Sequence, residues 1–320
     1  MNITRKIRLL RNFGLKIFLA DFCSSNIRIP RITARWKDKV LVSWLRKKYD
    51  YVVKNYMQKE EPPHSEHQDS SFCVWSMWWQ GEENLPEVVD LCFTNIRKHC
   101  GAHKFIIITK NNYREYIDLP EHIFRKVDSG AMTLTHFSDI VRMYLLSHYG
   151  GMWLDSTILV TENIPDEIFA MNYYTLNRGV DINDYHIAMK RWNVSVQFAH
   201  KGCLLCDFVL NIFIEYWKDH NSLVDYVLVD YVMALAYESL PTCRTMLDAV
   251  PTGNYAFNEL QHVLNEIFDA EKYHAMASTT QFFKMTYKHN FRRAKHGRET
   301  FYGYIMRNFL DKENNSPSDA

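Results

Sequence analysis

The stretch from Ser138 to Val160, SDIVRMYLLSHYGGMWLDSTILV, constrains the fold more than any other part of the sequence. Apolar residues recur at helical spacing in its first half, and after a Gly-Gly pair they form a run typical of a buried strand. Gly150 and Gly151 predict a helix end followed by a sharp backbone turn. The chain must therefore pass from a helix directly into a central strand, with Asp155 at or just beyond its carboxyl end.

The segments before this stretch predict a parallel sheet. Residues 71–81 read as an apolar strand that ends in a glycine turn, residues 85–100 as a helix, and residues 104–109 as a buried β-branched strand. Strand, helix and strand in this order place the two strands parallel. A helix over 137–148 and a strand over 152–160 continue the pattern, so the predicted class is α/β with helices on both faces of the sheet.

Positive charge is concentrated at the N-terminus. The 320-residue chain has a net charge of +1, yet residues 1–60 hold fifteen Lys and Arg against four Asp and Glu. A nucleic-acid-binding domain normally carries a basic surface on its folded part as well. The balance therefore argues against a nucleic-acid partner and indicates an anionic surface as the partner of residues 1–60.

Residues 3–20 predict a basic amphipathic helix, and residues 35–59 predict a second basic helix rich in aromatic side chains. The apolar face of the first helix comprises Ile3, Ile7, Leu10, Ile17 and Phe18. Two interpretations stay open for it: the helix lies in an anionic membrane interface, or it packs on the protein's own surface.

Composition divides the chain into four regions. They are a basic helical region over 1–60, a polar linker over 61–70, an α/β domain over 71–290, and a C-terminal helix with a disordered tail over 291–320. The seven scattered cysteines do not resemble a disulfide framework, and no apolar run reaches the roughly 18 residues that span a bilayer. These features predict a cytoplasmic protein.

Asp155 needs a partner, because an unpaired charge among apolar residues costs several kcal/mol. A divalent cation is one candidate, since Mg²⁺ and Mn²⁺ prefer oxygen ligands and commonly bind substrate phosphates. The alternative is structural: Asp155 caps a turn or pairs with Arg142. Asp139 and Arg142 are three residues apart and share one helix face, nearest the sheet edge where ligands of open α/β sheets bind.

The block HFSDIVRMYLLSHYGGMWLDSTILV resembles the core of the capsular polysaccharide synthesis glycosyltransferases, which are related to the sugar transferases with a DxD motif. Residues 78–89, 195–233 and 282–290 resemble further parts of that family. The resemblance implies a GT-A fold with a Rossmann-like mixed sheet. It also implies a nucleotide-sugar donor, most simply a UDP-sugar, and transfer of the sugar to an acceptor hydroxyl.

Carried over to this chain, the resemblance makes Asp139 and Arg142 donor-binding residues and Asp155 the first Asp of the DxD motif. Thr157 takes the place of the second Asp, a departure because a hydroxyl is a poorer ligand for Mn²⁺ or Mg²⁺ than a carboxylate. Asp-Ser-Thr is similar to the Asp-Ala-Thr form of the capsular branch. Asp155, Asp139 and Arg142 are thus the predicted catalytic residues, and Asp155 and Thr157 the predicted metal ligands.

Three more residues are predicted to contact the donor. Trp75 corresponds to a tryptophan that stacks on uracil in related toxins, although a core position, or Trp78 or Trp79 in that role, remains the alternative. Lys284 and Lys288 would neutralise the departing diphosphate, or else form an exposed lysine pair. Trp192-Asn193 is a candidate wall of the sugar pocket. Asp225 and Asp230 are candidates for the acceptor side, or else lie at solvated helix ends.

The predicted function is transfer of a sugar, with retention of anomeric configuration, to a capsular or other surface polysaccharide or a lipid-linked glycan. Residues 1–60 would hold the enzyme at the inner face of a bacterial membrane. Two alternatives remain: a non-catalytic nucleotide-sugar-binding scaffold, and a transferase that moves a sugar phosphate.

Overall fold

The structure is a computed structural model that describes residues 3–27, 29–59 and 72–311. The predicted linker over 61–70 and the tail beyond Asp311 lie outside the described residues. A five-stranded sheet in the order β2-β1-β3-β6-β5 forms the centre of the molecule. Its strands are β1 (Cys73–Met77), β2 (Lys104–Ile108), β3 (Gly151–Leu154), β5 (Tyr173–Thr175) and β6 (Val196–Ala199).

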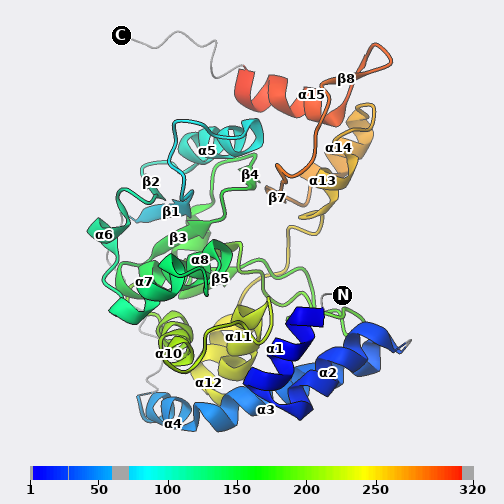
Figure 1. Cartoon of the computed structure of the whole chain (residues 1–320). Helices are drawn as coiled ribbons and strands as arrows, with labels where there is room; N and C mark the ends of the chain where they lie inside the picture. The colour runs from blue at the N-terminus through cyan, green and yellow to red at the C-terminus, as the bar shows by residue number, and fades with distance from the viewer. Residues whose placement is uncertain (1–2, 28, 60–71, 312–320) are drawn as a thin grey trace.

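The sheet is mixed. β1 pairs in parallel with β2 and β3, whereas β6 is antiparallel to both β3 and β5. Helix α5 (Glu87–His99) connects β1 to β2, and α8 (Leu134–His148) returns the chain across the sheet to β3. Right-handed connections that run in opposite directions place their helices on opposite faces, as Figure 1 shows for α5 and α8. The predicted α/β class with a Rossmann-like mixed sheet is confirmed.

The Gly-Gly pair turns the chain where backbone segments approach too closely for any side chain. Gly150 has φ +72° and Gly151 has φ +101°, a region that L-residues rarely adopt. A Cβ on Gly151 would lie 2.2 Å from the carbonyl oxygen of Cys73, and one on Gly150 would lie 2.6 Å from the amide nitrogen of Lys201. The pair therefore allows the end of α8 to meet the sheet directly.

One predicted strand is two strands in the structure. The run over 152–160 is interrupted by a turn, in which the amide of Ile158 donates to the carbonyl of Asp155. The chain then continues as β4 (Ile158–Val160), which leaves the main sheet and pairs antiparallel with β7 (Phe282–Lys284). Ile158 is opposite Lys284 in this register, so a lysine remote in sequence is brought to the end of β3.

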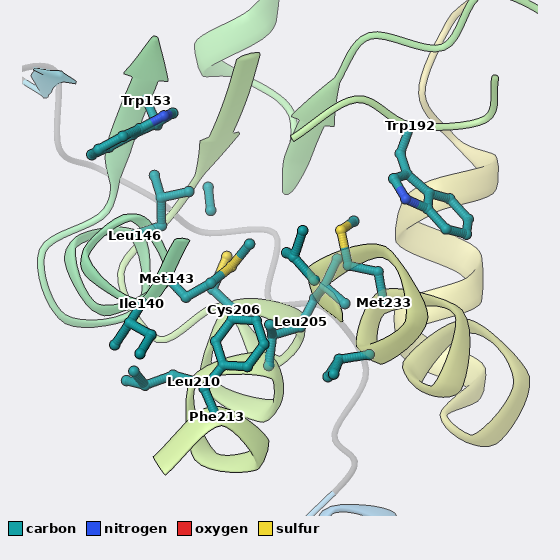
Figure 2. Close-up of a cluster of buried hydrophobic side chains, with 14 of the residues drawn as sticks. Ile140, Met143, Leu146, Trp153, Trp192, Leu205, Cys206, Leu210, Phe213 and Met233 are labelled. Atoms are coloured by element: carbon teal, nitrogen blue, oxygen red, sulfur yellow. The ribbon is translucent and has the colours of Figure 1, made fainter. Parts of the chain in front are cut away.

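The main core lies between the sheet and helices α8, α10 (Leu204–Asp219) and α11 (Leu228–Ser239) (Figure 2). Cys203 and Cys206 are buried here, and all seven cysteines are free thiols. Cys206 occupies the core as a small apolar residue, as expected for buried cysteine. The side chains that α8, α10 and α11 contribute include Ile140, Met143, Leu146, Leu205, Leu210, Phe213 and Met233.

The N-terminal region forms four helices rather than the two predicted: α1 (Ile3–Phe13), α2 (Leu15–Asn26), α3 (Pro30–Lys48) and α4 (Asp50–Gln58). Gly14, at φ +83°, separates α1 from α2. Ile17 is buried whereas Ile7 and Leu10 are exposed, so the predicted common apolar face is wrong; the buried side of α1 and α2 comprises Leu9, Phe13, Ile17 and Ala20. α3 packs against α11 and α4 against α10, and the helices share the main core.

The C-terminal part has a hydrophobic cluster of its own, built on α5, β4 and β7. No helix among the described residues is long and apolar enough to cross a membrane. The remaining elements are α6 (Tyr113–Tyr116), α7 (Glu121–Asp128), α9 (Asp166–Phe169), α12 (Pro241–Asp248), α13 (Glu259–Val263), α14 (Ala270–Ala277), β8 (Ala294–Lys295), β9 (Arg298–Glu299), α15 (Phe301–Met306) and the π-helix Arg307–Asp311.

Candidate active site

A cavity of about 520 Å³ opens at the carboxyl ends of β1 and β3. This is the edge at which open α/β sheets bind ligands. Its walls come from the segment after β1, one face of α8, the turn after β3, the first turn of α11 and the segment after β7. Of the predicted site residues, it brings together Asp139, Arg142, Asp155, Thr157, Lys284 and Lys288.

Asp155 is held by three donors. Its Oδ1 accepts from Arg142 at 3.0 Å and from the indole nitrogen of Trp153 at 2.9 Å, and its Oδ2 accepts from Lys284 Nζ at 2.9 Å. The Asp155 amide donates to the carbonyl of Ser195, which fixes the backbone as well. The counter-charge that Asp155 requires is therefore supplied by two cations of the chain itself, Arg142 and Lys284.

These neighbours determine the charge of Asp155. Burial alone would raise the pKa of its carboxyl, but Lys284, Arg142 and the hydrogen bond from Trp153 outweigh burial and hold that pKa well below its usual range. The carboxylate is therefore ionised at every pH at which the protein is expected to work.

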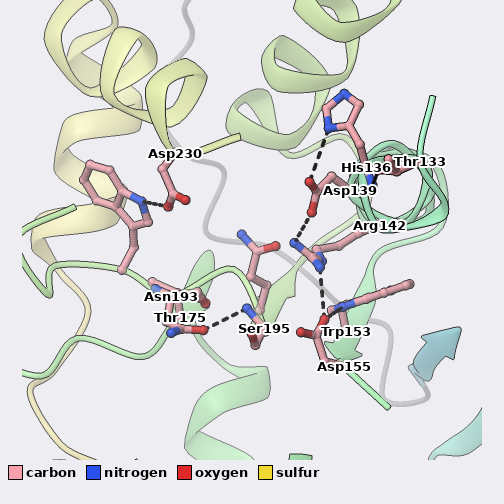
Figure 3. Close-up of polar contacts among 12 residues, drawn as sticks. Thr133, His136, Asp139, Arg142, Trp153, Asp155, Thr175, Asn193, Ser195 and Asp230 are labelled. Atoms are coloured by element: carbon pink, nitrogen blue, oxygen red, sulfur yellow. Dashed lines mark hydrogen bonds and ion pairs between the residues drawn. The ribbon is translucent and has the colours of Figure 1, made fainter. Parts of the chain in front are cut away.

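Arg142 links two carboxylates through its buried guanidinium. It donates to Asp139 Oδ1 at 3.1 Å as well as to Asp155, and it lies over the ring of Trp153 at 5.1 Å (Figure 3). Asp139 also lies 3.4 Å from the buried ring of His136. The predicted juxtaposition of Asp139, Arg142 and Asp155 on one side of a common cavity is therefore present. Two carboxylates face two cations, so the cluster of Asp139, Arg142, Asp155 and Lys284 is neutral by formal charge.

The prediction for Trp75 is wrong. Its side chain is 1% exposed, and its indole nitrogen donates to the carbonyl of Gly150 at 2.9 Å. β1 is buried on both faces, so a tryptophan within it packs inside the protein. Trp78 and Trp79 follow the end of β1 and line the cavity half-buried, with the ring of Trp78 5.4 Å from that of Tyr287.

Two substitutions test whether Trp75 is a core residue and whether Trp78 is a platform for a base. Trp75→Phe removes the hydrogen bond to Gly150 and leaves a cavity in the core, so we expect a loss of about 2–3 kcal/mol in the free energy of unfolding and unchanged affinity for UDP. Trp78→Ala removes a face on which a base can stack, so we expect UDP affinity to fall by about 1–3 kcal/mol. Urea unfolding and calorimetric titration with UDP measure both; weaker UDP binding by folded Trp75→Phe would contradict the assignment.

The side chains around Asp155 determine how many ligands the protein could offer to the predicted divalent cation. Among the described residues, no three His, Cys, Asp or Glu side chains converge to hold a metal ion. Lys284 Nζ nevertheless lies 2.9 Å from Asp155 Oδ2 and 3.5 Å from Ser195 Oγ, so a positive group already occupies a place between oxygen donors. Thr157 is nearby in the same wall and is 8% exposed. Asp155, Thr157 and Ser195 are the residues that could hold a cation here, and most of its ligands would have to come from a ligand's phosphates, as is common for Mg²⁺.

Some cavity residues were absent from the sequence predictions. Trp153 could have been found, because residues two apart on a strand point to the same face, and Asp155 follows Trp153 by two. Ser195 carried no such signal, since only the antiparallel pairing of β3 with β6 places it beside Asp155.

Comparison with known proteins gives two partial relatives. The chain is 28% identical over 107 residues to the O-glycosyltransferase PaGT of Phomopsis amygdali, covering 31% of this chain and 26% of that protein. It is 26% identical over 102 residues to the O-glycosyltransferase braB of Annulohypoxylon truncatum, covering 29% and 24%. The chain thus matches about a quarter of the length of these curated relatives.

Among solved structures, the PaToxG glycosyltransferase shows a TM-score of 0.41 at 10% identity, covering 75% of this chain and 94% of that one, a likeness from which we carry no residue over. The sequence model of the family described as capsular polysaccharide synthesis protein matches residues 24–305, which include α3, α4, the sheet and the whole cavity wall. The chain therefore belongs to the capsular polysaccharide synthesis protein family.

Proposed function

We propose that this protein is a glycosyltransferase that moves a sugar from a nucleotide-diphosphate sugar, most simply a UDP-sugar, to a hydroxyl of a surface polysaccharide or lipid-linked glycan. The observation that carries the proposal is the ionised Asp155, bonded to Arg142 and Lys284 at the sheet edge of a 520 Å³ cavity. Family membership and the two O-glycosyltransferase relatives support it.

The proposed reaction breaks the bond between the anomeric carbon of the sugar and the diphosphate. Negative charge grows on the departing diphosphate, so groups placed to meet it lower the barrier. Lys284 is partly exposed and can move its ammonium from Asp155 to a phosphate oxygen within the same cavity. Arg142 is buried and fixed by two carboxylates, so it serves as a rigid cation at the back of the site.

A divalent cation is part of this proposal. When bound, Mn²⁺ or Mg²⁺ neutralises diphosphate charge, and Asp155, with Thr157, would hold it once Lys284 has moved to the diphosphate. Asp139 keeps one oxygen on Arg142 and lines the cavity, where it can accept hydrogen bonds from sugar or ribose hydroxyls. Half-buried Trp78 and Trp79 are the available platforms for the base.

If the protein and the diphosphate hold the cation together, the cation should bind only when the nucleotide is present. Mn²⁺ alone should leave the thermal midpoint of the protein unchanged, because the described residues offer too few ligands for it. UDP with Mn²⁺ should raise the midpoint more than UDP with EDTA, since a ligand of the folded state stabilises in proportion to its affinity. In Asp155→Asn this difference should vanish. A wild-type response to UDP that is equal in Mn²⁺ and EDTA would refute the shared site.

The reaction itself is tested with the purified protein and a panel of UDP-sugars. We expect release of UDP from one donor, with loss of activity in Asp155→Ala. Binding without turnover would identify a non-catalytic scaffold, and release of a nucleoside monophosphate would identify a sugar-phosphate transferase. Retention of anomeric configuration, proposed on resemblance alone, is checked by NMR of the first product formed.

The N-terminal helices support a peripheral membrane location at the inner face of the cell membrane. Exposed apolar side chains on α1–α3, among them Ile7, Leu15 and Ile32, alternate with exposed basic residues. Apolar side chains can insert into a bilayer interface, and basic side chains beside them are attracted to anionic lipid headgroups. The interior side of the same helices includes Leu9, Phe13 and Leu45, so one face packs on the protein itself, and the membrane interface is proposed for the other face.

Because these helices share the main core, deletion of residues 1–60 would expose apolar surface and is a poor test. The double variant Leu15→Asp, Ile32→Asp is expected to bind phosphatidylserine vesicles at least ~10-fold more weakly, since two apolar side chains, 60% and 67% exposed, lose their transfer free energy. Co-sedimentation measures the bound fraction. Tyr255→Asp, similarly exposed in a different region, is the control, and equal binding by all three proteins would disprove the membrane surface.

A further inference from the structure

A second cavity of about 260 Å³ adjoins the candidate active site. Val194, Ser195 and Asp230 line both cavities, so a ligand in the second would border the first. We call it the side pocket. Its other walls come from the segment between β5 and β6, with Arg178, His186 and Trp192 among them. Pockets for drug-sized ligands have volumes of about 300–1,000 Å³, so the smaller side pocket suits a ligand such as a single sugar residue.

Arg178 is the feature of this pocket that needs explanation. Its guanidinium forms no hydrogen bond and no ion pair with any described residue, and its Nε is buried without a partner. The ring of Phe257 lies 5.6 Å from the guanidinium carbon and leaves its hydrogen-bond donors unused. Partial burial lowers the pKa of Arg178 despite the attraction of Asp184 and Glu259. The buried Nε–H of Arg178 lacks a hydrogen-bond acceptor, which is unfavourable, so an anion that entered the pocket and accepted from it would relieve that cost.

The other charged groups of the side pocket already have partners. Lys190 pairs with Asp181 at 2.9 Å, and His186 lies 3.5 Å from Asp230. Asp230 also accepts a hydrogen bond from the indole nitrogen of Trp192 at 2.9 Å, a contact drawn in Figure 3. Asp184 accepts from the amide of His186 and makes no ion pair with Arg178 within 4.0 Å. Among the described residues that line the pocket, Arg178 is thus the cation left for a ligand.

We infer that the side pocket binds a sugar bearing an anionic group, a carboxylate or a phosphate, with Arg178 as its counter-ion. Arg recognises both groups through paired, charge-assisted hydrogen bonds. Asp230 and Ser195, at the border with the main cavity, offer acceptor and donor atoms to sugar hydroxyls. That this sugar belongs to the acceptor rests on the proposed function; the binding of the anionic sugar does not.

Two indole N–H groups make the inference measurable. Trp192 donates to Asp230 at the border of the side pocket, and Trp153 donates to Asp155 in the main cavity. A shift of the Trp192 cross-peak without a shift of the Trp153 cross-peak therefore reports the side pocket. Methyl glucuronide and glucose 6-phosphate are the charged probes, and methyl glucoside is the neutral one. We expect one or both charged probes to shift the Trp192 signal and to leave that of Trp153 in place. Which of them acts identifies the group as carboxylate or phosphate.

Arg178→Gln is expected to weaken binding of the active probe about 10- to 100-fold, the factor for losing hydrogen bonds to a charged group. Arg178→Lys, which keeps the charge, should retain part of the affinity and shows that a loss in Arg178→Gln is not misfolding. Lys284→Met should bind the probe as the wild type does. Absence of any Trp192 shift, or equal probe affinity in folded Arg178→Gln, would overturn the inference.

The same spectra keep this inference apart from the proposed function. UDP should shift Trp153 equally in the wild type and in Arg178→Gln. If UDP has no effect while a charged sugar shifts Trp192, the donor proposal fails and the side pocket stands. If UDP shifts Trp153 and the charged sugars leave Trp192 unchanged, the side pocket fails and the donor proposal stands.

Discussion

Replacement of Asp155 by Asn is expected to lower the free energy of unfolding by about 3 kcal/mol and to abolish sugar transfer. The substitution leaves Arg142 and Lys284 without their shared counter-charge, and breaking a buried ion pair from one side typically costs about 3–5 kcal/mol. The low end applies because the Asp155 side chain is 23% exposed and Arg142 keeps Asp139. Urea unfolding measures the loss, and Asp118→Asn, at an exposed site, is the matched control.

The dependence of this effect on pH follows from the lowered pKa of Asp155. A carboxyl whose folded-state pKa lies below its unfolded value of about 3.9 contributes stability that is complete above that value. The contribution is lost as the pH falls through the folded-state pKa. The wild type and Asp155→Asn should therefore differ by a constant amount above about pH 5 and converge only in strong acid. A difference that grows between pH 6 and 8 would show that another group titrates.

Lys284→Met is expected to reduce kcat about 10²- to 10³-fold, the usual result of removing one group that meets developing charge. UDP affinity should fall as well, because the ammonium is proposed to move to the diphosphate. Stability should change little, since Asp155 keeps Arg142 and Trp153 as donors. Steady-state rates with the donor found by screening, and calorimetry with UDP, measure the two effects.

Two controls make the Lys284 result specific. Lys284→Arg keeps the positive charge and should recover part of the rate, whereas Lys104→Met removes an exposed lysine at the start of β2 and should have wild-type activity. Asp155→Asn combined with Lys284→Met should be less destabilised than the sum of the two single variants, because the second substitution removes a cation that the first left unpaired. Wild-type kcat in Lys284→Met would remove the lysine from the mechanism.

Local sequence patterns predicted the part of the site that lies within one stretch of chain. Asp139 and Arg142 share a helix face because they are three residues apart, and Asp155 follows the next strand after an obligatory glycine turn. Helical period, turn chemistry and strand burial are local properties, so a continuous stretch such as 138–155 encodes its own geometry. The same logic predicted the α/β class.

Predictions failed where the burial of a side chain depends on its contacts with other parts of the chain. Trp75 lies in a strand buried on both faces, and a strand of this kind shows no alternation that would tell an interior tryptophan from a ligand platform. Trp78, three residues later, is at the cavity because the strand has ended. In the N-terminal region, Leu9, Phe13 and Ile17 face the core, whereas Ile7 and Leu10 of the predicted apolar face are exposed.

The sequence by itself determined the helix, the Gly-Gly turn and the strand that bring Asp139, Arg142 and Asp155 to one sheet edge, since each step depends on near neighbours in the chain. Only the tertiary structure decided that Lys284 completes the cluster, through the pairing of β4 with β7, and that Arg178 is left without a partner beside it. The physical reason is that contacts between distant segments depend on strand register and on the packing of whole layers. Neither is encoded in the spacing of residues along one stretch.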